Sequence, residues 1–332
     1  MLGLQVTATQ ETDMPDSPLD NQEFELTFRS DVVYFWAWFF ASIAQMIDYE
    51  MPTLRKTTIQ MITEEFPTVA AVSKGQADMG FTTPAACATM AYRGIGPFAE
   101  KMTNLRAIGS FPHDDRMLWA VPAASPITDI SEMKDHPMRL ALPGPDFPVR
   151  FAVERILEAY GTSLDELQAA GWTLIEDSRC LTIPLHVIRG DADAVIHEGR
   201  KTPHWRQLAQ SGSMRFLPIR DDVLTMLEDD YGYRRAMLPR GSYPGVETDV
   251  PCIDFSDWLM FVRDDMPDEL AYTITRIFIE HSRDMMEMPF RMLPIEESDL
   301  TYPIDPREVW KNTGDLPLHP AAERYYREHG YM

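Results

Sequence analysis

The sequence predicts an α/β protein with mainly parallel sheets. Segments with the apolar patterns of strands and of helices alternate along most of the chain, which is typical of parallel strands covered by helices on both faces. The length of 332 residues allows about two domains of roughly 150 residues each. Apolar residues make up 45% of the chain and charged residues 25%, so a substantial core can form.

The first expected elements lie between residues 1 and 121. Residues 1–22 are rich in Asp, Glu, Pro, Ser and Thr and show no apolar period, which predicts a polar tail. The uncharged, aromatic segment Val32–Ile47 predicts a buried helix, because a bilayer span needs about 20 residues. The patterns further predict strands at 24–28, 57–61, 77–83, 105–110 and 117–121, and helices at 66–72 and 84–92.

A second set of elements is expected after a proline-rich connection at 122–126. It comprises strands at 138–142, 172–175 and 193–196, and helices at 149–160, 164–170, 183–189 and 203–210. A Gly- and Pro-rich stretch at 239–245 then precedes a strand at 258–263 and helices at 268–288 and 320–328. We interpret the two turn-rich stretches as crossovers, so that residues 23–121 and 246–332 form lobe 1 and residues 122–245 form lobe 2.

Charge excludes one class of function. Lys and Arg total 30 against 52 for Asp and Glu, a net charge of -22, so a nucleic acid would be repelled. The acidic, proline-containing N-terminus lacks the basic and apolar regions of a secretory signal. The chain as written is therefore expected in the cytoplasm, or in the periplasm if the native start lies upstream, and no membrane insertion is expected.

The common catalytic and cofactor motifs do not occur in the sequence. There is no GxSxG, P-loop, HExxH or dinucleotide GxGxxG, and Cys87, Cys180 and Cys252 form no CxxC pair, so no cofactor is predicted. The run His113-Asp114-Asp115 offers metal-ligand types. Three adjacent residues cannot all reach one ion, so a metal site is not predicted there.

Four passages share the motifs of one family. The first, residues 74–82, reads Lys-Gly-Gln-Ala-Asp-Met-Gly-Phe-Thr. The second combines Tyr92-Arg93-Gly94 with Pro97-Phe98 and with residues 104–108, Asn-Leu-Arg-Ala-Ile, and the third, residues 189–195, reads Arg-Gly-Asp-Ala-Asp-Ala-Val. The most specific is 317–330, Pro-Leu-His-Pro-Ala-Ala-Glu-Arg-Tyr-Tyr-Arg-Glu-His-Gly, which is close to P-L-H-P-G-A-x-R-Y-Y-x-E-x-G. In this order the passages resemble the solute-binding proteins of the TAXI family of tripartite ATP-independent periplasmic (TRAP) transporters.

The resemblance implies a type II periplasmic-binding-protein fold. In that fold two α/β lobes, joined by two crossovers, enclose a small ligand, usually a carboxylate or an amino acid, by hinge closure. His319, inside the terminal motif, is expected to fix the last helix onto lobe 1. The loops at 29–34 and 142–148 depart from the family because they lack most of the small residues that allow close approach to a carboxylate.

The expected ligand site lies at the strand ends of both lobes. The candidate ligand-binding residues are Ser30, Asp31, Tyr34, Thr82 and Thr83 in lobe 1, and Asp146, Phe147, Arg150, Arg179, His197 and Glu198 in lobe 2. Tyr34 can stack on the apolar part of a ligand or belong to the core. Arg150 and Arg179 can clamp a carboxylate or form surface ion pairs, and Thr82 or Thr83 can cap a helix or donate to the ligand.

The predicted function is binding of a small organic anion, a carboxylate that can be aromatic, as in TAXI receptors. If the protein is exported, the membrane subunits of a transporter are its expected partners. The alternative is a cytoplasmic enzyme on the same scaffold, such as a decarboxylase or isomerase of an aromatic or unsaturated carboxylate. His197, Glu198, Asp146 or Asp31 would then transfer protons. An intracellular ligand sensor is a third interpretation.

Overall fold

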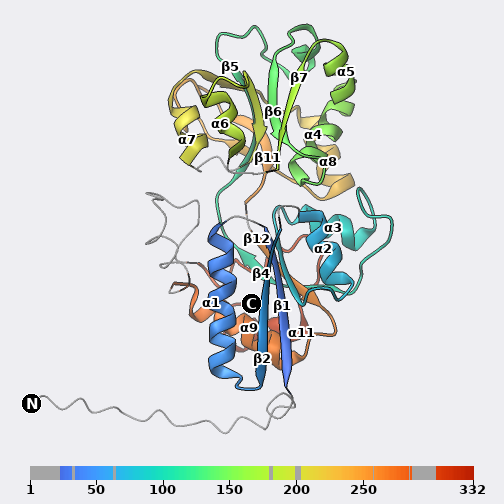
Figure 1. Cartoon of the computed structure of the whole chain (residues 1–332), viewed down its shortest axis with the longest axis vertical. Coiled ribbons are helices and arrows are strands. Elements are labelled where there is room, and N and C mark those ends of the chain that lie inside the picture. The colour runs from blue at the N-terminus through green and yellow to red at the C-terminus, as the bar shows by residue number, and fades with distance from the viewer. Residues whose placement is uncertain are drawn as a thin grey trace, which may run out of the picture.

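The computed structural model describes residues 23–31, 34–62, 65–178, 182–198, 203–256, 258–283, 285 and 304–332. Within these ranges, the side chains of residues 30, 31 and 34–39 are not described. The predicted polar tail, 1–22, lies outside the described residues. The chain folds into two α/β lobes, one above the other in Figure 1.

Lobe 1 is built on a sheet with the strand order β2-β1-β3-β12-β4. The strands are β1 (Phe24–Asp31), β2 (Leu54–Ile62), β3 (Met79–Thr82), β4 (Leu105–Phe111) and β12 (Trp258–Arg263). The helices are α1 (Tyr34–Glu50), α2 (Glu65–Ser73), α3 (Ala86–Arg93), α9 (Asp268–Glu280) and α11 (Pro320–Glu328). Leu26 and Phe28 of β1 pack with Phe40 of α1, because alternate residues of a strand face the same side.

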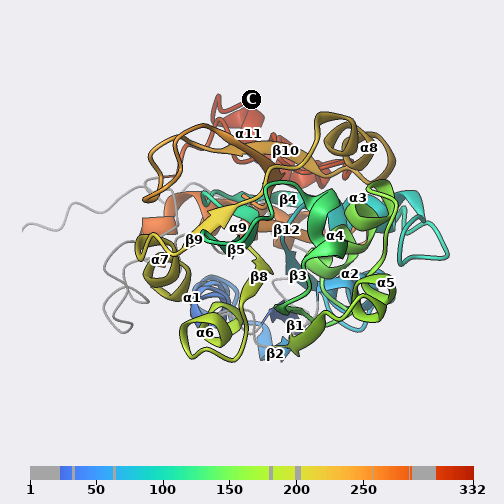
Figure 2. The ribbon, with the colours of Figure 1, turned by 90° about the horizontal axis from the view of Figure 1, so that it is seen from above.

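Lobe 2 contains a second sheet with the order β10-β11-β5-β8-β6-β7, and β9 pairs with β5. The strands are β5 (Arg116–Pro122), β6 (Arg139–Pro143), β7 (Thr173–Asp177), β8 (Ala194–His197), β9 (Met214–Phe216), β10 (Arg234–Leu238) and β11 (Val250–Asp254). The helices are η1 (Ile130–Asp135), α4 (Pro148–Ala159), α5 (Leu164–Ala169), α6 (Ile183–Ile188), α7 (Pro203–Gln210) and α8 (Asp221–Tyr231). Figure 2 shows α6 and α7 on one side of this lobe and α4, α5 and α8 on the other.

The predicted two-lobe fold is confirmed, but its sheets are mixed rather than mainly parallel. The pairs β1–β2, β1–β3, β6–β7 and β6–β8 are parallel. The pairs of β12 with β3 and β4, and of β5 with β8, β9 and β11, are antiparallel. The reason is that β5 and β12 enter their lobes from a crossover, and so run opposite to the strands of the local βα units.

The predicted positions of the crossovers and of the lobe boundaries are wrong. β5 and β11 both pair within the sheet of lobe 2, so the chain crosses at 112–115 and returns at 255–256. The stretch 122–126 is instead a connection inside lobe 2, and 239–245 is a turn between β10 and β11. Pro and Gly mark sharp surface turns, whereas these crossovers continue extended strands, and Pro112 alone does not make a turn-rich stretch.

The C-terminal segment belongs to lobe 1, as predicted for His319. This residue is 1% exposed, its Nδ1 accepts from the N–H of Ala321 at 3.2 Å, and its Nε2 lies 3.1 Å from the carbonyl oxygen of Met266. The N–H of His319 donates to the carbonyl of Ala107 at 2.8 Å and the Tyr326 hydroxyl donates to the carbonyl of Ile108 at 3.0 Å, so α11 is fixed to β4 at its N-cap and within its last turns. None of the helices that the structure describes has the length and apolarity to cross a bilayer.

Candidate functional site

The parallel strands of both sheets end at the junction between the lobes. Thr83, directly after β3, donates from its Oγ1 to the carbonyl of Phe255 in the second crossover, at 2.9 Å. The strands β1 and β2 are parallel to β3 and end with it. In lobe 2, β5 leaves the first crossover and β8 runs back against it, with His197 opposite Leu118. Because β6 and β7 are parallel to β8, their carboxyl ends also face the junction, which is where open α/β sheets bind ligands.

Thr82 and Thr83 lie together at the end of β3 but have different partners. The Thr83 hydroxyl is bonded to the crossover, as described above, so it holds β3 to the hinge. Thr82 is fully buried, and its Oγ1 has no hydrogen-bond partner among the described residues. The thiol of Cys87 lies beside this oxygen without the geometry of a hydrogen bond. Buried polar groups normally have a partner, so the hydroxyl of Thr82 keeps this residue among the candidates for ligand binding.

Glu65 is a candidate that the sequence analysis missed. It is the first residue of α2, immediately after the end of β2, and is 5% exposed. Its carboxylate is close enough to act on two neighbours, since it adds to the effect of burial in raising the pKa of the Cys87 thiol and of the Tyr233 hydroxyl. The signal in the sequence is the acidic pair before Phe66-Pro67, at the start of a predicted helix.

Arg150 is already paired with carboxylates. Its Nε lies 2.9 Å from Glu154 Oε1, one helical turn away, and its Nη1 lies 2.5 Å from Glu176 Oε1 on β7. Nη1 also donates to the carbonyl of Pro143 at 3.3 Å. The ion-pair alternative for this residue is therefore realised in the structure, and a ligand would have to compete with two anionic partners.

The other candidates of lobe 2 divide between surface and interior. Asp146 is exposed, whereas Phe147 is 3% exposed and begins α4 without a side-chain cap. His197 is 3% exposed at the end of β8, and its Nε2 lies 3.7 Å from Oε1 of Glu198. The two side chains thus approach each other, although neighbouring residues of a regular strand point to opposite faces.

The side chains of four predicted site residues lie outside what the structure describes. Arg179 falls in the gap between residues 178 and 182. The backbone of Ser30 and Asp31 forms the last part of β1, and Tyr34 is the first residue of α1, but their side chains are not described. The backbone alone brings these three positions to the junction, at the end of β1.

His113 lies at the first crossover, with its ring 5.9 Å from that of Trp258. It is 6% exposed, and its Nε2 lies 3.7 Å from Oδ2 of Asp115. Burial lowers the pKa of His113 to about 4, against the opposite effect of the Asp115 and Asp254 carboxylates. Within the described residues, no group of three or more His, Cys, Asp or Glu side chains could hold a metal ion.

Two α/β lobes, joined by two crossovers and with their strand ends facing one junction, define the periplasmic-binding-protein fold. The chain belongs to the NMT1-like family, which it matches over residues 33–330.

Solved structures share this fold at low identity. XAC2383 from Xanthomonas citri bound to chloride ion is 14% identical, with a TM-score of 0.52 over 92% of this chain and 95% of that one. PhnD1 from Prochlorococcus marinus (MIT 9301) in complex with methylphosphonate is 8% identical, with a TM-score of 0.52 over 93% of this chain and 99% of that one. At such identities the likeness establishes the fold and not the ligand.

Proposed function

We propose that the protein binds a small organic anion at the junction between its lobes. The observation that carries this proposal is the distribution of acidic residues among the helix N-termini. The helices α1, α3, α4, α6 and α7 follow strand ends at the junction, and none has Asp or Glu in its first turn. The helices α5, α8, α9 and α11 begin at the far ends of the lobes, and each has at least one acidic residue there.

In this asymmetry, five helix N-termini at the junction lack a compensating first-turn carboxylate. The N-terminus of a helix carries about half a positive charge and several unbonded N–H groups, which acidic residues normally compensate. In a chain of net charge -22, acidic residues are abundant, so their absence from these five first turns favours an anionic ligand. The α2 helix is the exception at the junction, because Glu65 occupies its first turn.

A thermal-shift screen tests the proposal. The panel should contain aliphatic and aromatic carboxylates, sulfonates and phosphonates, each with its neutral amide or ester. A ligand present at 100 times its Kd adds about 2.7 kcal/mol to the free energy of unfolding. We expect an acid to stabilise the protein and its neutral counterpart to have no effect. Stabilisation by neutral or cationic compounds alone would contradict the proposal.

A pair of substitutions that differ only in charge, placed in one of the five first turns, tests the role of a helix N-terminus in binding. Leu185 is half-buried in the first turn of α6, and Leu185→Glu adds a carboxylate there while Leu185→Gln adds only its neutral isostere. We expect the Glu variant to bind an anionic ligand about tenfold more weakly than the Gln variant, which corresponds to about 1.4 kcal/mol. Equal affinity of the two variants would exclude this helix from the site.

The proposal extends to a TAXI-type receptor of a TRAP transporter for a carboxylate, with a periplasmic location. The support is the resemblance of the four sequence passages, together with the helix N-termini described above. Co-purification of the chain with the membrane subunits of such a transporter, and its recovery in a periplasmic fraction, are the results expected. Recovery only in the cytoplasmic fraction would favour the enzyme or the sensor.

The second candidate, an enzyme on this scaffold, is favoured by the approach of His197 to Glu198. A histidine beside a carboxylate can move a proton to or from a bound substrate. Any compound found in the screen should be incubated with the protein and analysed by mass spectrometry. A product that forms with the wild type and not with His197→Gln would establish the enzyme, whereas unchanged compound and retained affinity would establish the binder.

A further inference from the structure

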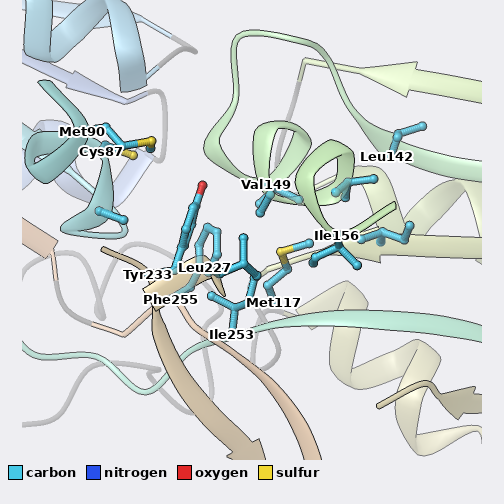
Figure 3. Packing of buried hydrophobic residues seen from close by; sticks show 14 of the residues in the cluster. Cys87, Met90, Met117, Leu142, Val149, Ile156, Leu227, Tyr233, Ile253 and Phe255 are labelled. Atoms are coloured by element: carbon cyan, nitrogen blue, oxygen red, sulfur yellow. The ribbon is translucent and has the colours of Figure 1, made fainter. Parts of the chain in front are cut away.

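One side of the junction is closed by an apolar contact between the lobes. The largest buried cluster of the molecule contains Phe66, Cys87 and Met90 from lobe 1 and Leu227 and Tyr233 from lobe 2. Figure 3 shows the Tyr233 ring between the side chains of α3 and those of lobe 2. The two lobes therefore share one continuous core on the side of α2, α3, α4 and α8. We call the interlobe part of this core, formed by Phe66, Met90, Phe151, Tyr231 and Tyr233, the apolar seal.

Aromatic rings form the centre of the apolar seal. The Phe151 ring of α4 packs edge-on against Phe66 of α2 at a centroid distance of 6.1 Å, and against Tyr231 at 5.1 Å. Phe66 is 6% exposed and Met90 is fully buried. Tyr233 is 2% exposed, and its hydroxyl donates to the carbonyl of Pro148 at 2.9 Å, so its polar end is satisfied inside the closed structure.

The backbones also meet closely beside the apolar seal. Gly232 ends α8 with a φ of +76°, and a Cβ atom added there would lie 2.6 Å from Cγ2 of Thr89 on α3. Arg93, at the end of α3, donates from Nη1 to the carbonyl of Asp229 in α8 at 3.2 Å. These contacts fit α3 against the end of α8 and add a polar rim to the apolar centre.

We infer that the apolar seal holds the lobes together in the absence of a ligand. The lobes then pivot about the seal, and the junction opens on the opposite side, where α1, α6 and α7 lie. A rotation that separated the seal would expose several large apolar side chains to water at once, which is unfavourable in proportion to their area. A rotation about the seal leaves them buried. The resting state is then closed at α3 and α8 whatever the ligand is, so this inference goes beyond the proposed function and does not depend on it.

Distances between spin labels in the ligand-free protein test the pivot. Labels on Lys101 and Glu158 span the sealed side, and labels on Gln45 and Gln207 span the opposite side, all at exposed positions. A Cys180→Ser background suits both pairs, because Cys87 and Cys252 are buried. We expect a narrow distance distribution for the pair 101/158 and a broader one for the pair 45/207. A broad or two-peaked distribution for 101/158 would overturn the inference.

Substitution at Phe151 tests the cause. Phe151 is half-buried and contacts lobe 1, so Phe151→Glu places a charge in the apolar seal, while Phe151→Leu keeps it apolar. We expect the Glu variant to show a larger radius of gyration by small-angle scattering and a longer 101/158 distance, and the Leu variant to match the wild type. A folded Glu variant with wild-type dimensions would overturn the inference. If the Glu variant does not fold, the wild-type distances decide alone, and neither result depends on whether an anion binds.

Discussion

The crossovers and the apolar seal are held by contacts of different chemical kinds. The crossovers are joined by polar bonds: Arg116 Nη1 donates to Ser256 Oγ at 2.7 Å and to Asp254 Oδ1 at 3.2 Å, and Phe255 N–H donates to the carbonyl of Asp115 at 3.2 Å. The apolar seal, in contrast, rests on aromatic and aliphatic side chains, with Phe66 and Phe151 at its centre.

This difference suggests a division of roles. Hydrogen bonds and ion pairs are directional, and at a partly exposed hinge they can be exchanged for bonds to water as the strands bend. An apolar contact has no preferred direction, and loses free energy in proportion to the area that becomes exposed. The crossovers therefore act as the connections that bend, while the apolar seal forms the pivot and defines the resting position.

The largest effect is expected from truncating the centre of the apolar seal. Phe66→Ala removes a ring that is 6% exposed and contacts Phe98 and Phe151, so it should lower the free energy of unfolding by about 3–5 kcal/mol. Phe40→Ala, a buried ring on the other face of lobe 1, is the control. Both should lower the denaturation midpoint, but only Phe66→Ala should lengthen the 101/158 distance. An equal lengthening in both variants would remove the distinction between the two cores.

The polar hinge should respond to pH, through His113. Its pKa is about 4 in the folded protein and about 6.5 in the unfolded chain, so the unfolded state binds more protons between these values. The stability due to neutral His113 is present above pH 6.5 and is lost as the pH falls to 4, by about 3 kcal/mol. Urea unfolding of the wild type and of His113→Gln across this range measures the difference. Parallel pH profiles would show that His113 does not cause the loss.

A smaller effect is expected from the hinge arginine. Arg116→Met keeps the aliphatic part but removes the bonds to Asp254 and Ser256, and its side chain is 18% exposed, so we expect a loss of about 2 kcal/mol. Arg235→Met is the control, since Arg235 pairs with Asp221 and Glu228 but is 38% exposed, and it should lower the free energy of unfolding less than Arg116→Met. Equal decreases in the free energy of unfolding, measured with urea, would mean that the bonds of Arg116 at the crossovers stabilise the fold no more than a surface ion pair.

The smallest effects distinguish the two threonines at the end of β3. Thr83→Val removes the bond to Phe255 and should lower the free energy of unfolding by about 1 kcal/mol. Thr82→Val removes a hydroxyl with no hydrogen-bond partner and should leave the unfolding free energy unchanged or raise it, while weakening an anionic ligand that uses this hydroxyl. Calorimetry and ligand titration of both variants measure these effects. If Thr82→Val lowered the free energy of unfolding and Thr83→Val weakened ligand binding, Thr82 would be the structural residue and Thr83 the ligand-binding one.

Much of the fold could be predicted from local patterns. The apolar period predicted α1, α4 and β12 near their observed bounds, because each is specified by residues close in sequence. The same patterns failed between residues 213 and 254, where α8, β10 and β11 were not predicted. The apolar residues of α8, Val223, Leu224 and Leu227, stand between acidic residues at both ends, and two of the five residues of β10 are exposed, so these short segments were passed over.

The candidate site was predicted in part, because some of its residues are specified by local strand patterns. Thr82 and His197 follow strand patterns, and the rule that parallel strands end at one edge brings them to the junction. The pairing of Arg150 with Glu154 and Glu176 could not be foreseen, because Glu176 belongs to another strand. Glu65 was missed because the pattern shows a helix start but not its burial.

The sequence by itself determined the class of fold and the order of most elements, and it placed the candidate site residues at strand ends, because these depend on spacing between near neighbours. Only the tertiary structure decided where the chain crosses between lobes, which charged groups are already neutralised and which side of the junction is closed by the apolar seal. These features arise from contacts such as that of Phe66 with Phe151, which exist only after both lobes have folded and met.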